Sequence, residues 1–184
     1  MIASRKIRRV SFDTNCWIDA ISPDADSYPF VNKLIAAHLA GNLKIHISIQ
    51  SLSEISKPPE VLDLVKQFTQ LPHWPIGSWE EQVGSWDQSA GTWDDGRRND
   101  LIQKELDQLA KSGNDIRDRG AYLDALLGGM DAFITSDRQF CGSGPAVRIE
   151  ERFGLKVLTP SNAATRLFQE VLAQLPIQLN GCAL

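Results

Sequence analysis

Short apolar, β-branched segments alternate along this chain with longer segments whose apolar residues recur at helical spacing. We expect strands at residues 7–12, 43–49, 132–135 and 155–158. We expect the main helices at residues 28–39, 61–68, 99–111, 118–128 and 161–172. Strands that alternate with helices form a parallel sheet covered on both faces. The sequence therefore predicts a three-layer α/β/α fold with a parallel sheet of about four to five strands.

A further short helix is expected after the second strand, where it leads into Glu54. Ser51 or Ser53 is the expected N-cap, because a serine oxygen can accept a backbone N–H of the first turn. Pro58 and Pro59 are expected to break this helix, since proline lacks the N–H that a helix interior needs.

The 184 residues fit one domain, 1–184, with two irregular parts. Residues 71–116 are interpreted as a partly helical insertion, and residues 176–184 as a loosely held tail. The insertion contains four of the five tryptophans: Trp74, Trp79, Trp86 and Trp93. These rings are expected either to pack in a core or to stack on unpaired bases or dock a protein partner.

Composition and charge narrow the class of protein. No apolar run approaches the roughly 20 residues that cross a bilayer, and no apolar segment suited to a signal peptide follows the basic N-terminus. Cys16, Cys141 and Cys182 lie far apart, which indicates free thiols in a reducing compartment. We therefore expect a cytoplasmic protein with no membrane partner.

The formal net charge of −4 argues against a nucleic-acid coat or architectural protein. It leaves room for an enzyme that acts on nucleic acid, because an acidic metal site makes the sum negative while a local basic rim binds the substrate. The candidate rim residues, each of which can equally be an ordinary solvated charge, are Arg97, Arg98, Arg117, Arg119 and Arg138.

Four acidic residues stand where a parallel sheet would gather them. Asp13 and Asp137 directly follow expected strands, and Glu54 follows the second strand after a short polar link. Asp118 opens a helix that returns to the start of the next strand. Ligand sites of open α/β sheets lie beyond the carboxyl ends of the strands. We therefore expect these four carboxylates at one edge, although each could instead be a turn, cap or surface residue.

The third acid has competitors. Asp118 shares a helical face with Tyr122, which is expected to face the core, so Asp118 is expected to point inward. Asp124 lies six positions later and is expected to turn away from that face. Asp131 is expected to cap the turn before a strand, and Asp115 is a further competitor.

Carboxylates gathered at one edge repel each other unless a cation neutralises them. Ligands that are all oxygens suit Mg²⁺ or Mn²⁺, whereas His46 and His73 are poorly placed for zinc. Such ions activate water and stabilise charge on a phosphodiester during hydrolysis. The four acids therefore indicate a metal-dependent nuclease.

Four segments resemble PIN domains, a family of metal-dependent nucleases. They are VSFDTNCWID at residues 10–19, SIQSLSEI at 48–55, DRGAYLDALLGGMDAFITSDRQF at 118–140 and GLKVLTP at 154–160. The resemblance implies a PIN-like fold in which Asp13, Glu54, Asp118 and Asp137 are the metal-binding and catalytic acids. It also implies that Asn15 and Thr135 support the acids through hydrogen bonds.

The resemblance further implies Mg²⁺- or Mn²⁺-dependent endonucleolytic cleavage of RNA. Many small bacterial members are VapC-like toxins that pair with an antitoxin protein and form homodimers. The Trp-rich segment departs from the minimal PIN pattern, which leaves the toxin assignment open.

Two other classes remain as alternatives. A phosphatase could use Asp13 as its nucleophile, but the usual second aspartate of such a motif is replaced by Asn15. A non-catalytic RNA-binding scaffold could share the fold, but such a domain need not keep all four acids.

Overall fold

The computed structural model describes residues 7–55, 59–71, 116–137, 140–141 and 144–172. Within them five parallel strands form one sheet in the order β3-β2-β1-β4-β5. The strands are β1 (Arg9–Phe12), β2 (Lys44–Ile47), β3 (Thr69–Gln70), β4 (Ala132–Ile134) and β5 (Lys156–Leu158). The helices are α1 (Thr14–Asp19), α2 (Tyr28–Leu39), α3 (Ile49–Glu54), α4 (Pro59–Val65), α6 (Ile116–Leu127), α7 (Gly144–Phe153) and α8 (Pro160–Leu172).

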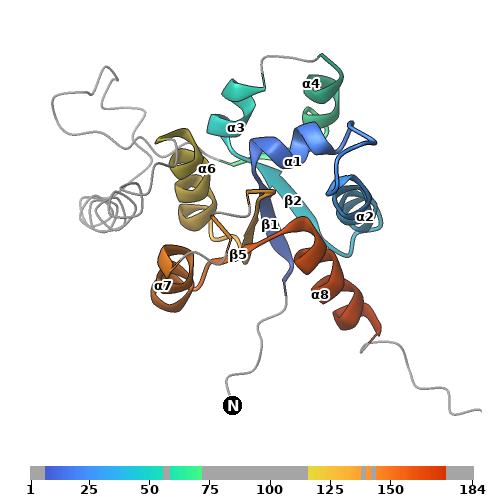
Figure 1. Ribbon diagram of the computed structural model, residues 1–184. Coiled ribbons are helices and arrows are strands. Elements are labelled where there is room, and N and C mark those ends of the chain that lie inside the picture. The colour runs from blue at the N-terminus through green and yellow to red at the C-terminus, as the bar shows by residue number, and fades with distance from the viewer. Residues whose placement is uncertain (1–6, 56–58, 72–115, 138–139, 142–143, 173–184) are drawn as a thin grey trace, which may run out of the picture.

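Helices cover both faces of the sheet, so the α/β fold expected from the sequence is confirmed. Figure 1 shows α2 and α8 on one side of the sheet and α6 and α7 on the other. Successive side chains of a strand point to opposite faces of the sheet, so alternate strand residues pack in two separate cores. Phe12 enters the core built with α1, α2, α4 and α8, whereas Phe133 enters the core built with α6.

Aromatic rings anchor both cores. Trp17 of α1 is fully buried, with its ring centroid 5.1 Å from that of Phe12 and 4.7 Å from that of Phe68. On the other face the ring centroid of Tyr122 lies 5.5 Å from that of Phe133. Burying such large side chains on each face fixes the helices against the sheet.

The two ends of the sheet are chemically different, and we call them the carboxyl edge and the amino edge. The carboxyl edge comprises the ends of the parallel strands together with α1 and α3, which follow β1 and β2 directly. The amino edge comprises the strand starts, including Arg9, Lys44 and Lys156. In Figure 1 the carboxyl edge is at the top and the amino edge at the bottom.

Several local expectations are corrected. The second strand ends at Ile47, because the side chain of Ser48 caps α3 by accepting the N–H of Ser51 at 2.9 Å. Ser51 and Ser53 are therefore not the cap. Pro59 begins α4 instead of only ending the preceding helix, which agrees with the tolerance of proline in a first turn. The sequence reading also missed the short elements α1 and β3 and the ten-residue helix α7.

Other expectations fall on residues that are not described. The helix expected at 99–111, the tryptophans of the insertion and the tail at 176–184 lie outside the described residues. Among the helices that are described, none is long and apolar enough to cross a membrane.

Candidate functional site at the carboxyl edge

Asp13 lies at the junction of the two central strands. It directly follows β1, and its backbone N–H donates to the carbonyl of Ile134 in β4 at 2.9 Å. Its Oδ1 accepts the backbone N–H of Thr14 at 2.7 Å, which makes Asp13 the N-cap of α1. Its Oδ2 accepts the hydroxyl of Thr135 at 2.8 Å. With 3% of its surface exposed, Asp13 is a buried carboxylate held by specific donors.

A threonine hydroxyl connects Asp13 to the second acid. Thr14, whose N–H binds Asp13, donates its Oγ1–H to Oε2 of Glu54 at 2.7 Å. The other oxygen of Glu54, Oε1, accepts Nε2–H of Gln50 at 2.9 Å, one helical turn earlier in α3. The short link between β2 and α3 thus brings Glu54 to the end of β1, as expected from the sequence.

A second threonine connects Asp13 to the third described acid. Thr135 directly follows β4, and its Oγ1 donates to Asp13 while accepting the backbone N–H of Asp137 at 3.0 Å. Oδ1 of Asp137 accepts the N–H of Phe140 at 3.3 Å. Asp137 is therefore held in a turn beside Asp13.

Burial and nearby negative charge raise the pKa values of two thiols at this edge. Burial, followed by the charges of Asp137 and Asp13, raises the pKa of the Cys141 thiol to about 11. Burial and the charge of Asp13 raise the pKa of Cys16 well above its ordinary value, and Asp19 acts in the same direction. In both thiols burial is the first cause, and the negative charges of nearby carboxylates add to it.

Asp118 lies in the first turn of α6, and its side chain is outside the described set. The backbone of that turn is at the carboxyl edge, because α6 leads through a tight turn to the start of β4. Gly120 packs against Gln50 of α3, so closely that a Cβ at Gly120 would lie 3.2 Å from Cγ of Gln50. The start of α6 is thus adjacent to the helix that carries Glu54.

The competing aspartates occupy different places. Asp124 is 1% exposed, so it is buried although helical periodicity turns it away from the face of Tyr122. Every residue from 121 to 125 of α6 is buried, because the helix is enclosed on a wider face than a single stripe. Asp131 lies at the amino edge, where its Oδ2 accepts the backbone N–H groups of Arg8 and Arg9, both at 2.9 Å. Asp115 is not among the described residues.

Sequence reasoning missed a fourth described acid at this edge, Asp19. Its Oδ2 accepts the hydroxyl of Ser136 at 2.6 Å and also the hydroxyl of Ser27. Ser136 directly precedes Asp137, so this cluster anchors the turn that carries Asp137. No local sequence signal marks it, because its partners Ser27 and Ser136 are 8 and 117 residues away.

Other predicted site residues are less informative. Asn15 is exposed, and it makes no side-chain hydrogen bond to an acid within the described part of the chain. Thr14, one residue earlier, binds Glu54 instead. The side chains of the predicted substrate-binding residues lie outside the described set: Arg97, Arg98, Arg119 and Arg138.

The donor chemistry of the edge fits a hard cation, because the carboxylates that stand there offer only oxygen. Among the side chains that the structure describes, no three His, Cys, Asp or Glu residues are close enough to form a metal-binding group. Asp118, which would complete the set, is the acid whose side chain is not described. The described residues thus supply part of a candidate ligand set, centred on Asp13.

The fold and this edge define an α/β protein whose parallel sheet gathers acids at its carboxyl end. Comparison of the chain with models of known protein families and with curated proteins found no match. Arguments about function therefore rest on the residues themselves.

Proposed function

We propose that this chain is a PIN-like, metal-dependent endoribonuclease that hydrolyses RNA phosphodiester bonds at the carboxyl edge. The observation that carries the proposal is the pair of threonine bridges, in which Thr14 and Thr135 join Asp13 to Glu54 and to the Asp137 turn. Hydroxyls that donate to a carboxylate fix which of its lone pairs remain available, as supporting residues of metal sites do.

The proposed ligands of Mg²⁺ or Mn²⁺ are Asp13, Glu54, Asp118 and Asp137. When bound, such an ion supplies a water of lowered pKa and neutralises charge on the phosphate. Asp13 would be the central ligand, because it is the most buried of the proposed ligands whose side chains are described and is held at both oxygens. Glu54 is held in place by the Thr14 hydroxyl and the Gln50 amide.

The chain's own residues also limit how far the acids can move. Ser136 donates to Asp19, and Thr135 accepts from the N–H of Asp137, so the turn after β4 is fixed at two successive residues. A turn fixed in this way keeps Asp137 near Asp13 before any ion binds. Such preorganisation lowers the reorganisation that metal and substrate binding would otherwise require.

The test is cleavage of a panel of single-stranded and hairpin RNAs by the full chain in Mg²⁺, Mn²⁺ or EDTA. We expect cleavage that needs the ion and disappears in Asp13→Asn and Asp118→Asn. Loss in Asp13→Asn and Asp124→Asn, but not in Asp118→Asn, would reassign the third ligand to Asp124. Failure to cut any RNA with either ion would count against a nuclease and favour a non-catalytic RNA-binding domain.

The finer expectations remain predictions from the resemblance. They comprise pairing with an antitoxin, homodimer formation and a cytoplasmic location. An antitoxin would be sought by co-expressing the small open reading frame next to this gene, if there is one, and testing for inhibition of cleavage.

A further inference from the structure

An apolar groove of about 490 Å³ lies between α2 and α8. Its apolar lining comes from both helices and includes Phe30, Leu34 and Ala37 of α2 together with Leu167 and Phe168 of α8. The three α2 positions recur at i, i+4 and i+7, so they form one stripe along the helix. The groove is therefore a continuous apolar surface to which two helices contribute.

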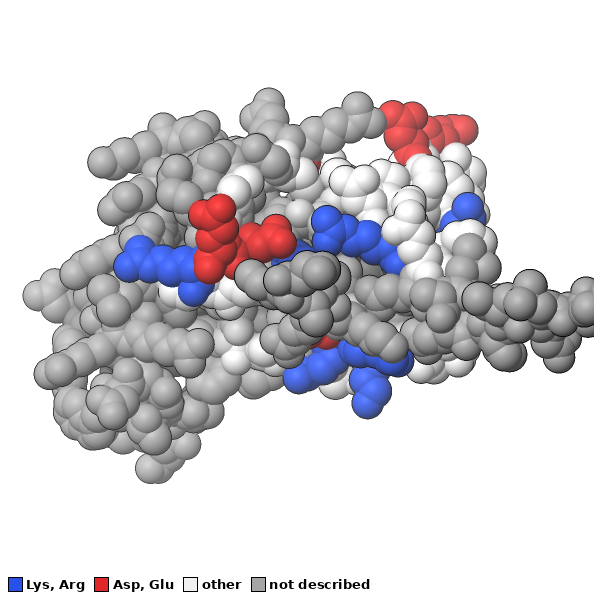
Figure 2. Space-filling view, turned by 90° about the horizontal axis from the view of Figure 1, so that it is seen from below, with Lys and Arg blue, Asp and Glu red and all other residues white. Residues whose placement is uncertain are grey.

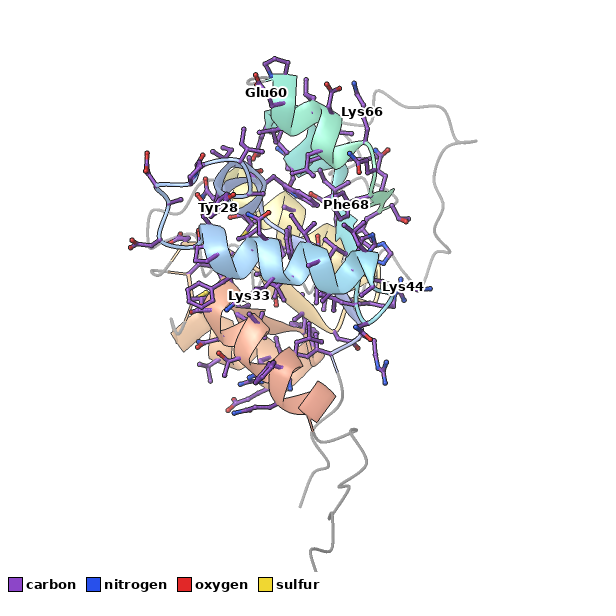
Figure 3. All side chains as sticks on the ribbon, turned by 90° about the vertical axis from the view of Figure 1, so that its right-hand side faces the viewer. Tyr28, Lys33, Lys44, Glu60, Lys66 and Phe68 are labelled. Atoms are coloured by element: carbon purple, nitrogen blue, oxygen red, sulfur yellow. The ribbon has the colours of Figure 1, made fainter. Side chains whose placement is uncertain are left out.

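The groove is open to solvent within the described part of the chain. Phe168 is 63% exposed, whereas its neighbour Leu167 is half-buried against the core. Among the described lining residues only Lys33 and Thr165 are not apolar, and Figure 3 shows Lys33 at the side of α2 that faces α8. Figure 2 keeps this side of the molecule on the right, where much of the described surface belongs to uncharged side chains. The groove thus suits an occupant that is apolar and carries no charge.

The sequence directly after α8 has that chemistry. Residues 171–184 contain no Asp, Glu, Lys or Arg, although these four residue types make up 23% of the chain. Segments that stay solvated are typically rich in charge and poor in aliphatic residues. This segment instead carries Leu175, Ile177 and Leu179 at alternate positions. In extended backbone that alternation places the three aliphatic side chains on one face.

The segment is long enough to return to the groove of its own molecule. α8 ends at Leu172, four residues and about 6 Å along the axis beyond Phe168. A straight helix cannot continue through Pro176, which also favours extended backbone at the residue before it. Residues 173–176 span up to about 14 Å when extended. That reach allows the residues after Pro176 to turn back to the level of Phe168.

The spacing of the aliphatic side chains also fits the groove. Alternate residues of an extended chain, such as Ile177 and Leu179, are about 6.6 Å apart. Phe30 and Leu34 are about 6 Å apart along the axis of α2. Two aliphatic side chains of the segment can therefore lie beside successive apolar residues of the stripe.

We propose that residues 173–184 dock in the α2/α8 groove of their own molecule, with Ile177 and Leu179 against the exposed ring of Phe168. Attachment to the end of α8 gives the segment an effective concentration in roughly the millimolar range, which favours it over a separate partner. Docking would make this segment part of the fold, in place of the loosely held tail expected from the sequence. It would also close the groove to a second copy of the chain.

Alkylation of an introduced thiol in the full chain tests the docking. Thr165→Cys places a thiol in the groove, where a docked segment protects it from iodoacetamide. Gln169→Cys, exposed on the same helix and outside the described lining, gives the reference rate. Peptide-resolved mass spectrometry separates these thiols from Cys16, Cys141 and Cys182.

A pair of double variants identifies the side chains that dock. Ile177→Ser with Leu179→Ser removes the aliphatic groups, which should shift the equilibrium toward release by at least about tenfold. The alkylation rate at position 165 should then rise by up to the same factor, while the rate at position 169 stays unchanged. The matched control, Gln174→Ser with Gln178→Ser, changes the opposite face of the extended segment and should leave both rates unchanged. Serine adds no charge, so it does not alter the pKa of the introduced thiol through charge.

The outcomes decide between the segment and other occupants of the groove. A faster rate at position 165 in the Ile177 and Leu179 variant alone, independent of protein concentration, supports the docking. Equal rates in the two double variants and the parent would overturn it. Protection that increases with protein concentration would assign the groove to a second copy and likewise overturn the proposal. Thermal unfolding verifies that each variant folds, and no readout requires RNA cleavage, so the test is independent of the proposed nuclease function.

Discussion

Two buried aspartates at opposite ends of the central strands show how differently one sheet uses the same side chain. Asp13 follows β1 at the carboxyl edge and is 3% exposed, whereas Asp131 precedes β4 at the amino edge and is 7% exposed. Asp131 uses one oxygen to accept two backbone N–H groups beside a cluster of cations. Asp13 accepts one N–H and one hydroxyl in a network that leads to further acids.

The difference arises from the polarity of parallel strands. At the amino edge a carboxylate can cap the N–H groups of an entering strand, so its charge is used in folding. At the carboxyl edge the chain leaves each strand through a turn, and side chains from several turns meet. Two carboxylates of similar burial thus have different expected roles, and isosteric substitution can separate them.

The largest effect is expected from exchanging the two acids for asparagine. Asp13→Asn should reduce RNA cleavage by more than the roughly 100-fold seen when a supporting residue of a metal site is lost. Asp131→Asn should leave the cleavage rate at saturating RNA close to wild type but lower the free energy of unfolding by about 1–2 kcal/mol. Cleavage assays and urea denaturation measure the two effects. Loss of cleavage in folded Asp131→Asn protein would contradict the assignment of Asp131 to folding alone.

The next effect is expected from the threonine that joins Asp13 to the Asp137 turn. Thr135→Val removes the hydroxyl but keeps the shape, and it should reduce Mn²⁺ affinity or cleavage by about 10- to 100-fold. Isothermal titration with Mn²⁺ gives the affinity independently of cleavage. Thr165→Val, at an exposed position of α8, is the matched control. Equal Mn²⁺ affinities in Thr135→Val and wild type would remove Thr135 from the site.

A smaller effect is expected on the reactivity of Cys141. Its pKa of about 11 keeps the thiol protonated at pH 8.5, so alkylation should be slow. Asp137→Asn removes a negative charge and should lower this pKa, which raises the thiolate fraction up to about tenfold per pKa unit. Peptide-resolved mass spectrometry after iodoacetamide treatment measures the rate. Asp131→Asn, at the other edge, should not change it, and a similar increase in both variants would show that the charge effect is not local.

The smallest effect is expected from His46 near the amino edge. Its folded pKa lies below the unfolded value near 6.5, so the unfolded state binds more protons. The stabilisation that depends on neutral His46 is complete above about pH 6.5. As the pH falls further, the free energy of unfolding decreases by at most about 1.4 kcal/mol per pH unit. Lys44→Gln should raise the folded pKa and flatten this loss between pH 7 and pH 5. Urea unfolding over that pH range measures the loss of stability. A steeper loss in the variant would show that the charge of Lys44 does not lower the pKa of His46.

Some of the carboxyl edge could be predicted because it depends on adjacency in the chain. Asp13 and Thr135 directly follow strands whose apolar residues are unmistakable, so parallel pairing alone brings them together. Glu54 was predicted at the same edge because only a short link separates β2 from α3. Predicting the positions of these residues required only the order of the strands and helices, and no detail of packing.

Other features could not be predicted, because they depend on contacts between distant segments. Asp19 acquires its partners only when α1 packs beside the turn after β4, since Ser136 is 117 residues away. The burial of Asp124 depends on how much of α6 is enclosed, which helical periodicity alone does not give. The Ser48 cap was missed because a β-branched residue, Ile49, looked like a continuation of the strand.

The sequence by itself determined the α/β class and the carboxyl-end position of Asp13, Glu54 and Asp137, since local patterns fix strands, and strand direction fixes the edge. Only the tertiary structure decided that Thr14 and Thr135 join these acids and that Arg9 pairs beside Lys44. The physical reason is that hydrogen bonds and potentials depend on distances across the sheet, which no local pattern of residues records.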